Sequence, residues 1–134
     1  MGDLFPQVMK ILALGKFYPP DRGGIETLLR SCCEGYVQHG AEVECVVANT
    51  ARNLVKETVN GVRLIRHSSR GLCFSMSMAP GYLFTARQAK ADLWHSHFPN
   101  PLADLACLLG PRQTPFILSY HSDVVRQKAV MKAY

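Results

Sequence analysis

Hydrophobic residues along the chain form short continuous runs, and between these runs they recur at helical spacing. The runs that have the length and apolar character of buried parallel strands are residues 8–14, 42–48, 92–97 and 114–121. The segments typical of helices are residues 25–39, 79–90, 101–110 and 123–134. Strands that alternate with helices predict an α/β domain with a Rossmann-like, mostly parallel sheet flanked by helices.

Residues 57–67 follow a different pattern, in which apolar and polar positions alternate around Asn60-Gly61. An Asn-Gly pair between two alternating segments predicts a β-hairpin with a two-residue turn. We expect a half-exposed pair of strands at an edge of the sheet, with Arg63 and Arg66 on its polar positions.

Composition agrees with a folded domain, because 48% of the 134 residues are hydrophobic and 19% are charged. The five cysteines show no C-x-x-C spacing, so they predict free thiols in a reducing compartment rather than a disulfide framework or a zinc knuckle. The first residues lack the pattern of a secretory signal, and no stretch approaches the ~20 apolar residues of a membrane span. We therefore expect a cytoplasmic protein.

The whole chain carries a formal net charge of +5, and its positive charge is concentrated in the middle of the sequence. The residues of this basic block are Arg52, Lys56, Arg63, Arg66 and Arg70. Such a block is either a solvated face or a contact for an anionic lipid or a phosphorylated substrate. Nucleic acid is not an expected partner, because no motif of a nucleic-acid-binding module is present.

The segment "FYPPDRGGIE", residues 17–26, connects the first predicted strand to the first predicted helix. Ligands of open α/β sheets bind beyond the carboxyl ends of the strands, which is where Gly23 and Gly24 are expected to lie. The free N–H groups and the dipole of the following helix favour an anion, and glycine lets a phosphate approach the main chain. A tight turn without a ligand is the alternative. Neither the dinucleotide-binding G-x-G-x-x-G motif nor a P-loop is present.

Three histidines fall at or near predicted strand ends. His95 and His97 lie two residues apart on one strand and therefore point to one face. With His121 they could form a zinc-like triad, although no carboxylate lies at metal-ligand spacing. His121 follows the apolar run "FILSY", where it could donate a hydrogen bond to a sugar hydroxyl or a backbone carbonyl, or remain a loop residue without a ligand.

Several stretches, taken in order, resemble the N-terminal domain of family 4 retaining glycosyltransferases of the GT-B fold. They are "KFYPPDRGGIETLLRSCCEGYVQHGAEVECVVAN", "NGVRLIRH", "ADLWHSHFPNPLADLA" and "PFILSYHSDVVRQKAVMKAY". The resemblance implies transfer of a hexose, of mannose or glucose type, from a nucleotide-sugar to a saccharide or lipid-linked acceptor with retention. It implies no metal and no other cofactor.

The resemblance also implies a role for individual residues. Gly23 and Gly24 would face the diphosphate of the donor, and His121 would contact the hydroxyls of the transferred sugar. The residues expected to line the same cleft more loosely are Asp123 and Arg126, and those expected towards the acceptor are His97 and Asn100.

The family's second domain, which holds the nucleotide base and ribose, has no counterpart in this sequence. We therefore interpret residues 1–134 as an incomplete N-terminal, acceptor-side domain that lacks transfer activity alone. Two other functions stay open, a non-catalytic anion- or nucleotide-binding α/β module and, with less support, a metal-dependent hydrolase that uses His95, His97 and His121.

Residues 70–90 combine apolar and basic residues in a way that is typical of interfacial membrane binding. The apolar residues expected at the surface are Leu72, Phe74, Met76, Met78, Tyr82, Leu83 and Phe84. They predict peripheral contact with an anionic membrane at its inner face. The alternative is that these side chains pack inside the protein.

Overall fold

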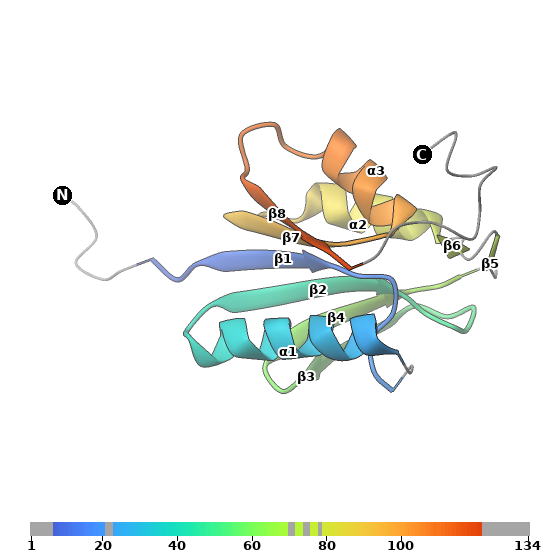
Figure 1. The fold of residues 1–134 in the computed structure, drawn as a ribbon, viewed down its shortest axis with the longest axis horizontal. Helices are drawn as coiled ribbons and strands as arrows, with labels where there is room; N and C mark the ends of the chain where they lie inside the picture. The colour runs from blue at the N-terminus through green and yellow to red at the C-terminus, as the bar shows by residue number, and fades with distance from the viewer. Residues whose placement is uncertain (1–6, 21–22, 70–71, 74–75, 78, 122–134) are drawn as a thin grey trace.

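The computed structural model of the chain describes residues 7–20, 23–69, 72–73, 76–77 and 79–121. Its centre is a six-stranded sheet in the order β3-β4-β2-β1-β7-β8 (Figure 1). The strands of this sheet are β1 (Lys10–Leu14), β2 (Glu42–Ala48), β3 (Val55–Val59), β4 (Val62–His67), β7 (Leu93–Phe98) and β8 (Phe116–Tyr120). All neighbours in the sheet are parallel except β3 and β4.

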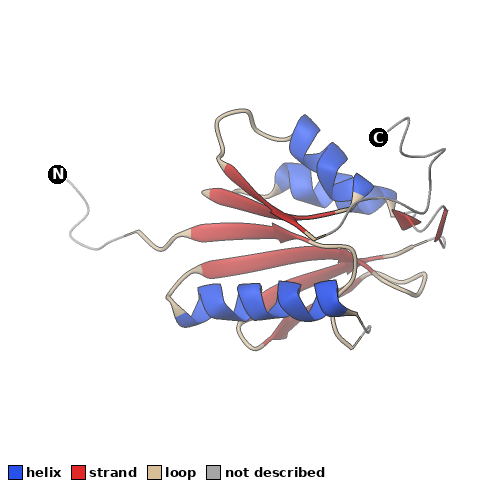
Figure 2. Cartoon of the chain, viewed as in Figure 1, coloured by secondary structure: helices blue, strands red, loops and turns tan. Residues whose placement is uncertain are grey.

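Helices cover both faces of the sheet (Figure 2). Helix α1 (Gly24–Gln38) lies on one face, and α2 (Pro80–Gln88) and α3 (Pro101–Leu109) lie on the other. The predicted α/β class, with a mostly parallel sheet flanked by helices, is confirmed. A two-stranded ribbon, β5 (Leu72–Cys73) with β6 (Met76–Ser77), was not predicted. The helix predicted at residues 123–134 lies outside the described residues.

The central strands are buried on both sides, which explains their continuous apolar runs. Alternate residues of β1 point to opposite faces of the sheet and so enter two cores. Ile11 and Ala13 belong to the core under α1, called the α1 core, and Leu12 and Leu14 belong to the core under α2 and α3. Each fully buried leucine or isoleucine contributes about 1.5–3 kcal/mol relative to exposure. Cys33 and Cys45 lie in the α1 core as free thiols.

Gly15 allows α1 to pack directly on the end of β1. A Cβ atom at this position would lie 2.2 Å from Cδ2 of Leu29, a helix residue, and 3.3 Å from Cγ1 of Val47. The absence of a side chain at Gly15 therefore brings the start of α1 close to the carboxyl end of the sheet.

The predicted hairpin is confirmed, with φ of 49° at Asn60 and 83° at Gly61, as a type I′ turn requires. The expectation for Arg66 was wrong, because its side chain is buried and only 8% of the residue is exposed. Arg66 shares a face of β4 with the core residue Leu64, and Arg63 points to the other face. The basic block is therefore not one surface.

Candidate functional site

The strand order places the candidate site between the carboxyl ends of β1 and β7. The chain leaves β1 through α1 on one face of the sheet and enters β7 through α2 on the other face. In open α/β sheets, ligands bind at the point where the direction changes in this way. Residues 15–20 and 23–24 after β1, 98–100 after β7 and His121 after β8 lie at this end.

The loop after β1 is fixed by hydrogen bonds to its main chain. Tyr82 of α2 donates its hydroxyl to the carbonyl of Gly15 at 2.9 Å, and the amide of Ala48 donates to the carbonyl of Lys16 at 2.9 Å. The side chain of Tyr18 is fully buried in the α1 core. The loop that leads to Gly23 is therefore attached to both layers of the domain.

Arg66 adds a second attachment to the same loop. Its Nη1 donates to the carbonyl of Tyr18 at 2.9 Å, its Nη2 donates to the carbonyl of Pro19, and its Nε donates to Oε1 of Glu57 at 3.0 Å. The guanidinium also lies 5.8 Å from the centre of the Tyr18 ring. A hydrogen-bonded, charge-paired guanidinium is a strong contact in a buried position. Sequence reasoning missed this role, since nothing local distinguishes Arg66 from a surface arginine.

Gly23 is the N-cap of α1, and Gly24 is the first helical residue. The amide and the hydroxyl of Thr27 both donate to the carbonyl of Gly23, at 3.2 Å and 3.0 Å. The amide groups of the first helical turn have no partner within the helix, so they and the helix dipole favour a negative charge. A Cβ atom at Gly24 would have no neighbour within 4 Å.

Glu26 supplies a negative charge at this helix end, which sequence reasoning did not single out. Its Oε2 lies 1.9 Å from the position that a Cβ atom of Gly23 would take. An acidic residue in the first turn of a predicted helix was the available signal for Glu26.

Lys16 lies in the loop after β1, and its ammonium is 5.5 Å from the centre of the Phe17 ring. Burial lowers the pKa of Lys16, and the negative charge of Glu26 opposes this change.

The structure brings the three predicted histidines together on the α1 face of β7 and β8. His97 lies beside Ser119 in the parallel register, and the amide of His121 continues the ladder by donating to the carbonyl of Phe98 at 3.2 Å. Nδ1 of His97 lies 2.9 Å from Nε2 of His121, and the two rings stack at 5.2 Å.

Both ring nitrogens of His95 form hydrogen bonds within the protein. Nδ1 lies 2.8 Å from the hydroxyl of Tyr36, and Nε2 lies 2.7 Å from Oγ of Ser119. His95 therefore has no free nitrogen for a metal ion in this arrangement. Over the described part of the chain, no group of three or more histidines, cysteines or carboxylates is arranged to hold a metal.

The histidines differ in their access to solvent. His97 is 2% exposed and His95 is also buried, whereas His121 is half-buried. Burial, reinforced by His95 and His121, lowers the pKa of His97 to about 4. Burial and the neighbouring His121 also lower the pKa of His95. Of the three rings, His121 is therefore the one placed to meet a ligand.

Asn100 begins α3 at the same end of the sheet. Its Oδ1 accepts a hydrogen bond from the amide of Ala103 at 3.5 Å, and the residue is 4% exposed. Its position is that of a helix N-cap. Contact of His97 and Asn100 with an acceptor stays a prediction, and Asp123 and Arg126 lie outside the described residues.

The segment predicted to contact a membrane is partly inside the protein. Tyr82, expected at the surface, is 1% exposed and belongs to the core under α2, whereas Phe84 is 66% exposed. Among the described residues, no helix has both the length and the apolar character needed to cross a membrane. Membrane contact stays a prediction.

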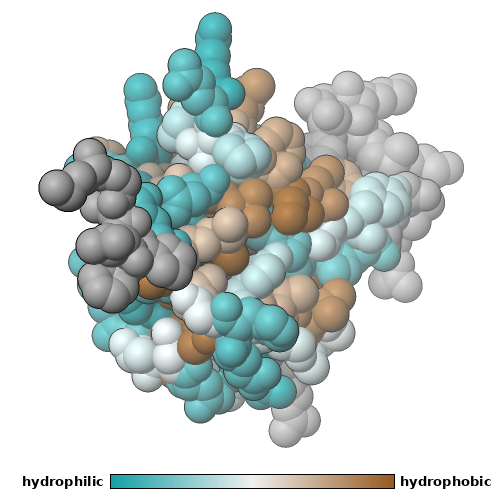
Figure 3. Space-filling view, turned by 90° about the vertical axis from the view of Figure 1, so that its left-hand side faces the viewer, coloured by the Kyte–Doolittle hydropathy of each residue, from teal (hydrophilic) through white to brown (hydrophobic). Residues whose placement is uncertain are grey.

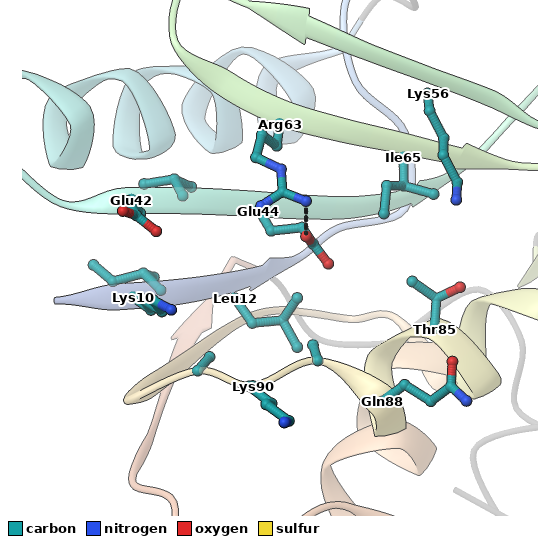
Figure 4. A pocket seen from close by; sticks show the side chains of 14 residues that line it. Lys10, Leu12, Glu42, Glu44, Lys56, Arg63, Ile65, Thr85, Gln88 and Lys90 are labelled. Carbon is teal, nitrogen blue, oxygen red and sulfur yellow. Dashed lines mark ion pairs between the residues drawn. The ribbon is translucent and has the colours of Figure 1, made fainter. Parts of the chain in front are cut away.

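A pocket of about 430 Å³ lies at the opposite end of the sheet, where the strands begin (Figure 4). Lys10, Lys56 and Lys90 line it, together with Glu44 and Arg63, which form an ion pair at 3.5 Å. Figure 3 views the molecule from this end, where hydrophilic side chains surround a band of hydrophobic ones. Because α/β sheets bind ligands at the carboxyl ends of strands, this pocket is not the candidate site.

The fold defines a class, the α/β domains in which helices cover both faces of a mostly parallel sheet and the direction of winding changes between two neighbouring strands. Within this class, the model of one family, Glycosyltransferase Family 4, matches residues 22–134. The chain therefore belongs to Glycosyltransferase Family 4, and the resemblance seen in the sequence is confirmed.

Two characterised proteins are similar to the chain over almost its whole length. O-antigen chain mannosyltransferase C of Escherichia coli is 26% identical over an alignment of 132 residues, which covers 94% of this chain and 35% of that protein. D-rhamnosyltransferase WbpZ of Pseudomonas aeruginosa is 29% identical over an alignment of 133 residues, which covers 94% of this chain and 34% of that protein. The chain thus spans about a third of the length of these relatives.

A solved structure with the same fold is that of sucrose-phosphate synthase from Thermosynechococcus elongatus. The TM-score is 0.64 at 18% sequence identity, and the match covers 90% of this chain and 36% of that chain. The likeness supports the α/β fold with its mostly parallel sheet.

Proposed function

We propose that this chain is the acceptor-side, Rossmann-like domain of a retaining hexosyltransferase. The enzyme transfers a hexose from a nucleotide-sugar to a saccharide or lipid-linked acceptor. A second domain, of the kind that the family resemblance implies, holds the base and ribose of the donor. The observation that carries the proposal is the family match over residues 22–134, which includes Gly23, Gly24 and His121 at one end of the sheet.

The main chain of the first helical turn would stabilise the leaving diphosphate. The amide groups at the start of α1 and the helix dipole are directed towards negative charge that develops during transfer. Gly24 leaves space for a phosphate, because a Cβ there would have no neighbour within 4 Å. The carboxylate of Glu26 lies near the same helix end, so it must move aside or be neutralised when a diphosphate binds.

His121 would orient the transferred sugar. A ring nitrogen of an imidazole can form a hydrogen bond with a hydroxyl group of a hexose. Holding the donor and the acceptor in a reactive geometry supplies a large part of the rate acceleration in such a transfer. His121 is therefore a candidate catalytic residue in the sense of a residue that touches the substrate.

The names of the two relatives reduce the range of donor sugars that we propose for this chain. One is a mannosyltransferase and the other is a D-rhamnosyltransferase. D-Rhamnose is 6-deoxymannose, so the two sugars share the configuration of every ring carbon and differ only at carbon 6. We therefore favour a donor with the mannose configuration over one with the glucose configuration.

The test uses the whole protein that contains this chain, with GDP-mannose, GDP-D-rhamnose and UDP-glucose as donors and a lipid-linked oligosaccharide as acceptor. We expect transfer from a GDP-sugar, a product that keeps the anomeric configuration by NMR, and a loss of about a hundredfold in kcat/KM for His121→Ala. His39→Ala is the matched control, because His39 is exposed at the far end of α1. Absence of transfer from every donor would contradict the proposal.

Transfer is expected to need no divalent metal. The same assay after exhaustive dialysis against EDTA should give an unchanged rate, and addition of Mg²⁺ or Mn²⁺ should not raise it. A rate that collapses with EDTA and returns with one metal would instead support the metal-dependent alternative.

A further inference from the structure

His95, His97 and His121 form a row of imidazole rings that ends beside the carboxyl ends of β7 and β8. The His95 and His97 rings stack with centres 4.4 Å apart and planes at 28°, and those of His97 and His121 stack at 5.2 Å and 9°. The outer ring, His121, is half-buried, and the inner two are buried. The inner rings therefore form the wall against which His121 lies.

Hydrogen bonds within the row are unequally distributed. His95 has a hydroxyl partner at each nitrogen, and either hydroxyl can donate or accept. Within the part of the chain that the structure describes, the His97 ring has one hydrogen-bond partner, Nε2 of His121, which lies 2.9 Å from its Nδ1. Nε2 of His97 is buried and has no hydrogen-bond partner among the described residues. The tautomer of His97 therefore determines whether Nε2 of His121 faces a hydrogen-bond donor or an acceptor.

A neutral His97 carries one N–H group, on either Nδ1 or Nε2. A proton on Nε2 would leave a buried donor without an acceptor, and unpaired buried N–H groups are rare in folded proteins. A proton on Nδ1 forms the N–H···N hydrogen bond to His121 and leaves only a lone pair unpartnered on Nε2. Burial and the two neighbouring imidazoles hold the pKa of His97 at about 4, so the ring is uncharged near neutral pH.

We propose that His97 is a positioning residue that donates its Nδ1 proton to Nε2 of His121, which leaves the proton of His121 on Nδ1. The hydrogen bond fixes the tautomer of His121 and, with the stacking of the two rings, its orientation. The donor that His121 can present is then Nδ1–H, and its Nε2 is occupied. The inference rests on the proposed function only for the nature of the ligand, a sugar hydroxyl or a phosphate-linked oxygen.

The direct test is the tautomer of each histidine in the folded chain, read from two-bond ¹H–¹⁵N correlations of the ¹⁵N-labelled protein near pH 7. We expect protonated Nδ1 and bare Nε2 signals for both His97 and His121. A neutral ring that carries its proton on Nε2, at either His97 or His121, overturns the inference. No donor or acceptor sugar is needed, so the result is independent of the proposed function.

Two variants of His97 distinguish the effect of its hydrogen bond to His121 from the effect of its packing. His97→Asn keeps an amide donor near the position of Nδ1, and His97→Leu keeps volume but removes the donor. We expect His121 to remain the Nδ1–H tautomer in His97→Asn and to shift to the Nε2–H form, which free imidazoles prefer, in His97→Leu. An unchanged tautomer of His121 in a folded His97→Leu protein contradicts the inference.

The same variants can be compared in the transfer assay of the whole protein. We expect kcat/KM to fall about tenfold in His97→Leu, the equivalent of about 1.4 kcal/mol, and to fall less in His97→Asn. Equal losses in both variants, with equal thermal stability, would mean that His97 acts through packing alone. If His97→Leu does not fold, the wild-type tautomers and His97→Asn still decide the question.

Discussion

At the scale of single residues, the three glycines between the end of β1 and the start of α1, Gly15, Gly23 and Gly24, differ in what a side chain would meet. Gly15 is required by packing, because a Cβ there would lie 2.2 Å from Leu29. At Gly23 a Cβ would meet only the flexible carboxylate of Glu26, and at Gly24 it would meet nothing within 4 Å. Packing therefore explains Gly15 and leaves Gly24 to be explained by what approaches the helix from outside.

Gly24→Ala is expected to separate stability from function. Alanine suits a helix better than glycine by up to about 1 kcal/mol, so the free energy of unfolding should stay level or rise. A methyl group at the start of α1 should hinder the diphosphate and lower kcat/KM about tenfold or more, since small misplacements are costly in catalysis. Urea denaturation of the chain and donor kinetics of the whole protein measure the two effects.

Gly35→Ala provides the matched control for this variant. Gly35 lies in the same helix, and a Cβ there would also have no neighbour within 4 Å. It should change stability in the same direction and leave transfer unaffected. If Gly24→Ala transferred as fast as Gly35→Ala, the phosphate-facing role of Gly24 would be wrong.

At the scale of elements, sequence patterns predicted most of the helices and strands because their signals are local. Residues 42–48 were predicted as a strand and form β2, and the helix predicted at 25–39 is α1 at Gly24–Gln38. The ribbon of β5 and β6 was missed, because strands of two residues each are too short to show a period.

The candidate site was predicted in part. The meeting of His95, His97 and His121 followed from parallel strands whose carboxyl ends lie together. The hydrogen bonds that order them did not, because Tyr36 and Ser119 come from distant parts of the chain and have no pattern of their own. The contact of Arg66 with the carbonyls of Tyr18 and Pro19, in the loop after β1, was missed for the same reason.

Arg66→Lys is expected to loosen that loop. Lysine cannot reproduce the fork of the guanidinium, which donates to two carbonyls and to Glu57. We expect a loss of about 1.5–3 kcal/mol in the free energy of unfolding, the range for a hydrogen bond made by a charged group. Amide hydrogen exchange should also become faster in the loop after β1.

Arg63→Lys on the same strand is the comparison for Arg66→Lys. The Arg63 side chain is 71% exposed, and its ion pair with Glu44 lies at the surface. Its replacement should change stability by no more than about 0.5 kcal/mol. Equal effects of the two substitutions would contradict the anchoring role of Arg66.

At the scale of the whole molecule, stability should decrease as the pH falls from about 6.5, the ordinary pKa of histidine, towards 4. Burial lowers the pKa of His97 to about 4 and also lowers those of His67 and His95. In this range the unfolded chain binds protons that the folded chain does not, so the free energy of unfolding rises with pH. Urea midpoints between pH 5 and 7 measure the slope.

Asp104 acts in the opposite sense, because burial raises its pKa to about 6 and favours proton binding by the folded chain. Asp104→Asn should therefore steepen the dependence on pH, and His97→Gln should flatten it. A slope that His97→Gln leaves unchanged would show that His97 titrates in the folded protein as it does in the unfolded chain.

The attachment of the loop after β1 through its main chain has a consequence for how specificity can change. Arg66 binds the carbonyls of Tyr18 and Pro19, and neither contact depends on the side chain that the acceptor residue carries. New side chains at positions of this loop that do not pack in a core can therefore be tried without giving up the attachment, which leaves out Phe17 and Tyr18. A library that varies such positions and keeps Arg66 and Glu57 would test whether the loop takes part in the choice of donor sugar that we propose.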